Sequence, residues 1–154
     1  MLKGIDHRLN SELLGALRAM GHGDTIVLVD RNFPSFSVAK NTIHGTPLFM
    51  ENLSAAVVAK AILSVMPLDN FVEDYAVAME VVGAPDETPD VQKEVEAVLK
   101  AAEGSDKALS KVERFSFYEA AKNAYAIVQT GETRFYGCFI FKKGVIAPDQ
   151  VFEA

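Results

Sequence analysis

Cysteine is almost absent from this chain of 154 residues. Cys138 is the only one, which excludes an intramolecular disulfide and every zinc site built from several cysteines. The three histidines, His7, His22 and His44, show no spacing typical of metal ligands, so we expect no metal site. A single thiol fits a reducing compartment, and the simplest expectation is a cytoplasmic protein.

The sequence also lacks any segment with an excess of positive charge. Acidic residues outnumber basic ones by 21 to 15, and Lys and Arg are scattered along the chain, so we expect no nucleic acid partner. No apolar run approaches the roughly 20 residues that cross a bilayer. The N-terminus lacks the apolar core of a signal peptide. These absences predict a soluble protein without a membrane partner.

Helix and strand patterns alternate along the whole chain. Residues 25–29 are wholly apolar and mostly β-branched, which is typical of a strand covered on both faces. Further strands are predicted at residues 75–82, 112–115, 125–129 and 138–141, with a weak one at 47–50. Helix N-caps are predicted at Asn10 or Ser11, at Asn52, at Thr88 before Pro89, and at Ser116 with Glu119. The alternation predicts a single α/β domain over residues 1–154, with a largely parallel sheet flanked by helices.

A short turn, Gly21-His22-Gly23-Asp24, lies between the first predicted helix and the apolar strand. The two glycines permit positive φ and remove bulk beside the imidazole, which both gives and takes a proton near neutrality. A second interpretation is a plain helix-to-strand turn with His22 at its solvated tip. Spacing alone leaves both interpretations open. The turn is not a dinucleotide fingerprint, because it precedes a strand and Ile26 stands where the third glycine belongs.

Three more residues are candidates for a site. Asp30 directly follows five apolar residues, where a carboxylate is costly without a function, and open α/β sheets bind ligands beyond the carboxyl ends of their strands. Arg114 lies at a predicted strand-to-helix junction beside aromatic residues, as either a sugar or anion clamp or a surface residue. Cys138 begins an apolar strand, which favours a packed thiol over a nucleophile.

An ordered set of segments carries a resemblance to a known family. They are Met1-Leu2-Lys3, Glu12-Leu13-Leu14, residues 20–24, Asp30 with Phe33-Pro34, residues 114–119, Ala126-Ile127-Val128, Thr130-Gly131-Glu132, Tyr136-Gly137 and residues 142–145. Together they resemble the ribose pyranase and fucose mutarotase family, whose members interconvert sugar anomers, over nearly the whole chain. Arg114 followed by Phe-x-Phe-Tyr-Glu resembles the fucose branch, because the ribose branch has a histidine at that place.

The resemblance implies a mutarotase of L-fucose that needs no cofactor, with His22 as the catalytic residue that transfers protons. It implies sugar-binding groups at Asp30, Arg114, Tyr136, Gly137 and Cys138. It also implies a homo-oligomer, in bacterial relatives typically a decamer of two stacked pentameric rings. In such an assembly His22 and Asp30 form one half of the site, and the segment from Tyr136 to Cys138 comes from a neighbouring subunit.

Cys138 departs from the family pattern, which usually has asparagine after the Tyr-Gly pair. A thiol donates and accepts hydrogen bonds only weakly, and an unpaired polar group costs roughly 1–3 kcal/mol, so we expect this residue to affect sugar preference or affinity. Two alternative functions stay open. One is a non-catalytic sugar-binding accessory protein of a transport or regulatory system, and the other is a D-ribose pyranase.

Overall fold

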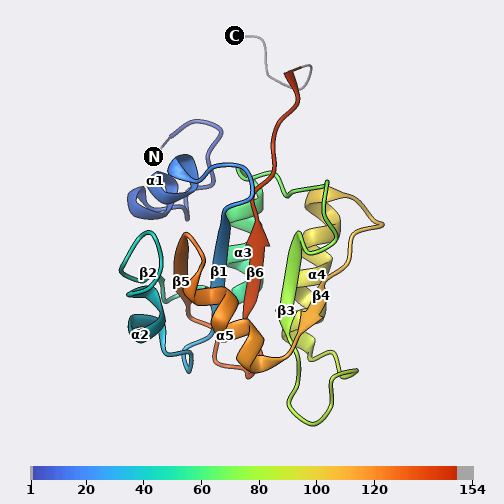
Figure 1. Cartoon of the computed structure of the whole chain (residues 1–154). Coiled ribbons are helices and arrows are strands. Elements are labelled where there is room, and N and C mark those ends of the chain that lie inside the picture. The colour runs from blue at the N-terminus through green and yellow to red at the C-terminus, as the bar shows by residue number, and fades with distance from the viewer. Residues whose placement is uncertain (1, 149–154) are drawn as a thin grey trace.

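A single six-stranded sheet forms the centre of the computed structural model, which describes residues 2–148 (Figure 1). The strands are β1 (Thr25–Val29), β2 (Leu48–Met50), β3 (Ala76–Met79), β4 (Ser110–Val112), β5 (Ala126–Thr130) and β6 (Phe139–Lys142). Their order in the sheet is β2-β5-β1-β6-β3-β4. Only β6 is antiparallel to its neighbours, β1 and β3, so the predicted largely parallel sheet is confirmed. Met1 lies outside the described residues.

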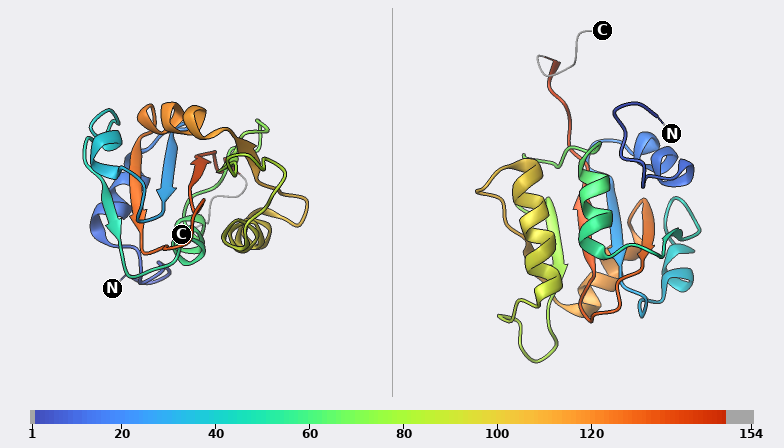
Figure 2. Two further views of the ribbon diagram at one scale, coloured as in Figure 1. Left: turned by 90° about the horizontal axis from the view of Figure 1, so that it is seen from below. Right: turned by 180° about the vertical axis from the view of Figure 1, so that it is seen from behind.

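Helices cover both faces of this sheet. They are α1 (Ser11–Ala19), α2 (Ser35–Ala39), α3 (Ala55–Leu63), α4 (Asp90–Glu103) and α5 (Arg114–Lys122). The two views of Figure 2, together with Figure 1, show α3 and α4 on one face, and α2 and α5 on the other. Within residues 2–148 no helix combines the length and the apolar character that crossing a bilayer requires.

The position of β1 at the centre of the sheet explains why residues 26–29 are all apolar. Ile26 and Leu28 belong to the core beneath α1, α3 and α4, whereas Val27 and Val29 belong to the core beneath α2 and α5. Side chains alternate between the faces of a strand, so a strand covered on both faces needs apolar residues at every position. All four side chains are fully buried.

Several predicted boundaries are confirmed, and others are wrong by a few residues. β1 matches its prediction residue for residue, and Asn10 caps α1 by accepting a hydrogen bond from the Leu13 amide at 2.8 Å. The caps of α3 and α4 are Ser54 and Pro89 instead of the predicted Asn52 and Thr88. β3 ends at Met79, and residues 80–82 belong to the following loop. The sequence pattern does not predict the short helix α2.

The start of α5 differs most from its prediction. The expected strand over residues 112–115 ends at Val112, and α5 begins at Arg114. The reason is Glu113, whose carboxylate accepts hydrogen bonds from the amides of Phe115 at 2.8 Å and Ser116 at 3.1 Å. The observed cap lies three residues before the predicted cap, Ser116, so Ser116 lies within the first turn of the helix. Arg114 still follows a strand and opens a helix.

Replacing Glu113 by alanine removes the acceptor for two amides at the start of α5. We expect the free energy of unfolding to fall by about 1 kcal/mol, measured by urea unfolding followed by circular dichroism. Ser116→Ala is the matched control, because Ser116 is exposed and does not cap the helix. Equal losses in the two variants would show that Glu113 is not the cap.

Candidate functional site

A cavity of about 380 Å³ lies where β1 ends and β6 begins. Four of the predicted site residues line it, namely Asp30, Arg114, Tyr136 and Cys138. They meet because β6 runs antiparallel to β1, which brings the residue before β6 beside the residue after β1. Five further residues line the cavity that were not among the predicted site residues, namely Asn32, Phe33, Met79, Tyr118 and Phe135. The cavity therefore combines charged groups with aromatic walls.

Asp30 and Cys138 are in contact at the base of this cavity. The Cys138 thiol donates a long hydrogen bond of 3.6 Å to one carboxylate oxygen of Asp30, and the other oxygen accepts from the Asn32 amide at 2.9 Å. Both side chains are buried. Burial raises the pKa of Asp30, and burial together with the charge of Asp30 raises the pKa of Cys138 well above its usual value. The thiol therefore stays protonated, and the predicted packed thiol is confirmed.

Arg114 brings an unused hydrogen-bond donor to the cavity. It is the first residue of α5, and its guanidinium carbon lies 4.8 Å from the centre of the Phe115 ring. Its Nε atom is buried and has no hydrogen-bond partner within residues 2–148. Leaving such a donor unpaired costs about 1–3 kcal/mol, and a bound ligand with an oxygen acceptor would recover this cost. The interpretation of Arg114 as a clamp is thus favoured over a surface role.

Tyr136 has an unusual backbone conformation at the mouth of the cavity. Its φ of 62° is the only positive value at a non-glycine residue within residues 2–148, a conformation that costs energy unless the surroundings impose it. The carbonyl of Tyr136 accepts a hydrogen bond from the Gln92 side chain at 3.2 Å, and its hydroxyl accepts one from the Val82 amide at 3.2 Å. These contacts from two other segments hold Tyr136 in place.

Gly137 allows the chain to pass close to the cavity wall. A Cβ atom at this position would lie 2.8 Å from Glu132 Cγ and 3.5 Å from Asp30 Cβ. Any side chain would therefore displace its neighbours. The structure assigns Gly137 a packing role between Tyr136 and Cys138.

His22 lies in a different part of the molecule, in the turn between α1 and β1. Its Nε2 atom is 3.1 Å from the buried carboxylate of Asp69, and its ring meets the edge of Phe71 with ring centres 6.0 Å apart. The imidazole is half exposed, and Phe71 is 77% exposed. Desolvation by burial acts to raise the pKa of Asp69, but hydrogen bonds from the Phe71 amide and His22 lower it overall. Asp69 therefore remains a carboxylate that orients the imidazole.

Within one chain, the structure groups the site residues differently from the predicted division between subunits. His22 precedes β1 and Asp30 follows it, so the whole strand separates them, and a strand rises about 3.3 Å per residue. Asp30 instead shares its cavity with Tyr136 and Cys138 of the same chain. The sequence already indicates this separation, because the residues that precede and follow one strand lie at its opposite ends. Within one chain, His22 is the predicted residue that lies apart.

The comparisons with known proteins agree with this architecture. The profile of the RbsD / FucU transport protein family matches residues 3–146. This chain belongs to that family. The fucose mutarotase of Homo sapiens is 45% identical over 150 residues, which cover 95% of each chain. The resemblance found in the sequence is thus confirmed at the level of the family.

Two solved structures of similar proteins match nearly the whole chain. Protein Atu2016 has a TM-score of 0.93 and 56% sequence identity, with 96% of this chain and 97% of that chain covered. The fucose mutarotase of Streptococcus pneumoniae in complex with L-fucose has a TM-score of 0.84 and 37% identity, with 95% and 100% covered. The fold of this chain is therefore that of the family.

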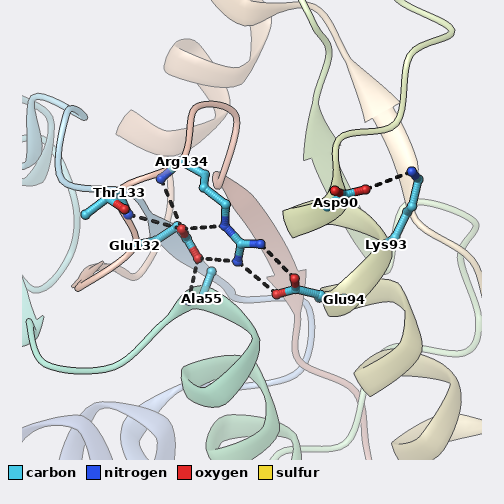
Figure 3. A network of polar contacts seen from close by, with 7 residues as sticks. All are labelled: Ala55, Asp90, Lys93, Glu94, Glu132, Thr133 and Arg134. Carbon is cyan, nitrogen blue, oxygen red and sulfur yellow. Dashed lines mark hydrogen bonds and ion pairs between the residues drawn. The ribbon is translucent and has the colours of Figure 1, made fainter.

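In this RbsD / FucU family member, an ion-pair network fixes the segment that leads to Tyr136 (Figure 3). Glu132 accepts hydrogen bonds from Arg134 Nε and Nη2, both at 2.9 Å, and from the Ala55 amide at the start of α3 at 3.4 Å. Arg134 also donates two bonds of 2.7 and 2.8 Å to Glu94 on α4. The hydrogen bonds from Arg134 lower the pKa of the buried Glu132 to about 2. The network thus anchors the loop to two helices.

Replacing Glu132 by glutamine should lower the free energy of unfolding by about 2–3 kcal/mol at pH 7, because Arg134 loses its buried charged partner. The pKa of Glu132 is about 2 in the folded chain against an ordinary 4.5. Its contribution is therefore fully present above pH 4.5 and is lost as the pH falls towards 2. Urea unfolding at pH 7 and pH 3 should show a smaller difference between the two proteins at pH 3.

Asp90→Asn is the matched control, because Asp90 lies on α4, the helix that carries Glu94. The Asp90–Lys93 ion pair is exposed on both sides and does not touch the loop (Figure 3), so we expect little change at either pH. A gap between wild type and Glu132→Gln that stays constant from pH 7 to pH 3 would contradict the lowered pKa.

Proposed function

We propose that this chain is a cofactor-independent mutarotase, one domain over residues 1–154, that interconverts the α and β anomers of L-fucose or a similar free monosaccharide. One observation carries the proposal: the cavity gathers the buried Asp30 carboxylate, the unpaired Nε of Arg114 and aromatic side chains in one place. Acceptors and donors beside aromatic surface suit a sugar, which has hydroxyl groups and apolar C–H faces. The relatives named fucose mutarotase support the same substrate class.

Mutarotation needs two proton transfers and no redox step. The ring oxygen gains a proton while the anomeric hydroxyl loses one, and the open-chain aldehyde then closes on its opposite face. In our proposal His22 carries the proton transfer, with Asp69 orienting its imidazole. Asp30 and Arg114 hold sugar hydroxyl groups, and Tyr136 closes the mouth of the site, so that the anomeric carbon meets the imidazole.

We propose that the imidazole comes from a neighbouring copy of the chain, because His22 and the cavity lie at opposite ends of β1. Large apolar side chains are exposed on both surfaces. Phe71 lies beside His22, while Phe135 and Phe115 lie beside the cavity residues, with exposures of 77%, 73% and 63%. Association would bury them. The family resemblance supports a homo-oligomer, specifically a decamer of two stacked pentameric rings. The single thiol fits a reducing compartment, which supports a protein that works in the cytoplasm.

A second candidate is a sugar-binding accessory protein without catalysis, which the family description as transport proteins favours. It uses the same cavity and differs only in leaving the anomer exchange rate unchanged. A D-ribose pyranase is the third possibility, and it differs in the sugar whose exchange is accelerated.

Exchange NMR of L-fucose tests the catalytic proposal directly. The wild-type protein should accelerate exchange between the α and β anomers, and His22→Asn should lower the acceleration by about 10²–10⁴-fold, the usual effect of losing a general acid or base. His44→Asn is the matched control, because within residues 2–148 the His44 ring hydrogen-bonds to nearby Thr46, away from the cavity.

Three results of this experiment would count against parts of the proposal. Full activity of His22→Asn would remove His22 from the mechanism. Binding of L-fucose with unchanged exchange would favour the accessory protein. Faster exchange of D-ribose than of L-fucose, measured side by side, would favour the pyranase.

Mixing two inactive variants tests whether the site is shared between subunits. His22→Asn and Arg114→Met should each be inactive alone. When the two are unfolded and refolded together, a random assembly should regain about a quarter of wild-type activity, since half of each residue type is intact and the two pair between chains. An inactive mixture that elutes as the normal oligomer would show that His22 and Arg114 act within one chain.

A further inference from the structure

The chain that leaves β6 runs beside the turn that carries His22. Because β6 is antiparallel to β1, it ends where β1 begins (Figure 1). The Lys143 amide donates a hydrogen bond to the Asp24 carbonyl, and the Lys143 carbonyl accepts one from the Gly23 amide, both at 2.8 Å. Gly23 and Asp24 directly follow His22 in the chain. The backbone of Lys143 therefore fixes one end of the turn.

The side chain of Lys143 fixes the other end of the same turn. Its Nζ atom donates to the carbonyls of Leu17 at 2.7 Å and Met20 at 2.6 Å, where α1 ends. The last carbonyls of a helix lack a partner within the helix, and the helix dipole favours a cation beside them. Burial lowers the pKa of Lys143, so the ammonium costs free energy that these contacts offset. One lysine thus holds the chain on both sides of His22.

The same segment holds Asp69, the partner of the imidazole. The Asp69 amide donates to the Lys142 carbonyl at 3.0 Å. Next in the chain, Gly144 leaves no room for a side chain, because a Cβ atom would overlap the carbonyl of Leu68. The backbone before Asp69 is therefore in close contact with the chain after β6. This segment sets the distance between Asp69 and the His22 turn.

We propose that Lys143 is a positioning residue for the proton transfer, which holds the turn at both ends and so keeps His22 Nε2 3.1 Å from the Asp69 carboxylate. This inference rests on the proposed function, in which His22 carries the proton. The residues that line the sugar cavity do not include Lys143. Its loss should therefore affect the chemical step and leave sugar binding unchanged.

The variant Lys143→Met removes the ammonium and keeps most of the side-chain stem. From exchange NMR over a range of L-fucose concentrations, we expect kcat to fall about 10–100-fold, the scale of a small misplacement of a reacting group, with KM within about twofold of wild type. Lys143→Arg should recover most of this loss, because a guanidinium also donates to carbonyl oxygens. An unchanged kcat in Lys143→Met would overturn the inference.

Lys142→Met is the matched control, because it removes the adjacent lysine. The Lys142 ammonium pairs with the exposed carboxylate of Asp74 at 2.6 Å, and its charge also acts on Asp69. If the loss of a positive charge near Asp69 were sufficient, this variant would also lose activity. We expect kcat within about twofold of wild type. Equal losses in the two lysine variants would contradict a positioning role for Lys143.

Magic-angle-spinning NMR measures the order of the imidazole without any activity. The chain has three histidines, so isotope-labelled histidine gives few ring signals, and His22→Asn assigns those of His22. We expect the order parameter of the His22 ring to fall from about 0.8 in the wild type to below about 0.6 in Lys143→Met. The His44 ring, which hydrogen-bonds to Thr46, is the internal control. An unchanged His22 ring would overturn the inference.

Gly144→Ala reaches the same pair of side chains from the other side and leaves the lysine in place. Its methyl group must displace the Leu68 carbonyl, and with it Asp69, so both kcat and the order parameter of the His22 ring should fall. This variant decides the question if circular dichroism shows that Lys143→Met does not fold. Wild-type values of both quantities in a folded Gly144→Ala would then overturn the inference.

The two readouts separate failure of this inference from failure of the proposed function. If the wild type does not accelerate exchange of L-fucose, the mutarotase proposal fails, and Lys143→Met should still lower the order parameter of the His22 ring. If the wild type is active and Lys143→Met keeps both its kcat and its ring order, the positioning role of Lys143 fails alone.

Discussion

The antiparallel pairing of β6 with β1 is the constraint on which the cavity depends. Leu28 pairs with Phe139, so the residue that follows β1 meets the residue that precedes β6 at the carboxyl end of β1. This pairing alone places the Cys138 thiol against Asp30. If β6 ran parallel to β1, the first residues of β6 would lie at the amino end of β1, beside His22. One reversed strand in an otherwise parallel sheet thus brings residues 108 positions apart into contact.

Around the contact between Asp30 and Cys138, buried polar groups use only part of their capacity for hydrogen bonds. Within residues 2–148, Arg114 Nε has no hydrogen-bond partner. One oxygen of Asp30 accepts a long, weak hydrogen bond from the Cys138 thiol. Such groups reduce stability unless something binds them. Folding energy from the apolar faces of β1 offsets this cost, and a ligand that satisfies the groups gains affinity from them. The cavity is preorganised for a polar ligand in this sense.

The walls of the cavity are held by contacts that are remote from any ligand. Arg134 has its donors occupied by Glu132 and Glu94, so it anchors a loop and does not present its charge to the cavity. Together with the Gln92 side chain, this anchoring imposes the positive φ of Tyr136. A strained residue persists only where its surroundings determine it in this way. The imidazole of His22 is held separately, by Asp69, at the amino end of β1.

Local patterns in the sequence were enough for the fold class, for β1 and for four of the nine residues that line the cavity. The apolar run before Asp30 predicts a strand covered on both faces, and the ordered motifs indicate the family. Only the tertiary structure decided where α5 begins, because Glu113 competes with Ser116 for the cap and the periodicity does not distinguish them. It alone showed that Tyr118 faces the cavity and that Glu94 holds Arg134, since these contacts join elements far apart in the chain. It also placed Cys138 against Asp30, because the register and direction of strands follow from long-range pairing that no local pattern encodes.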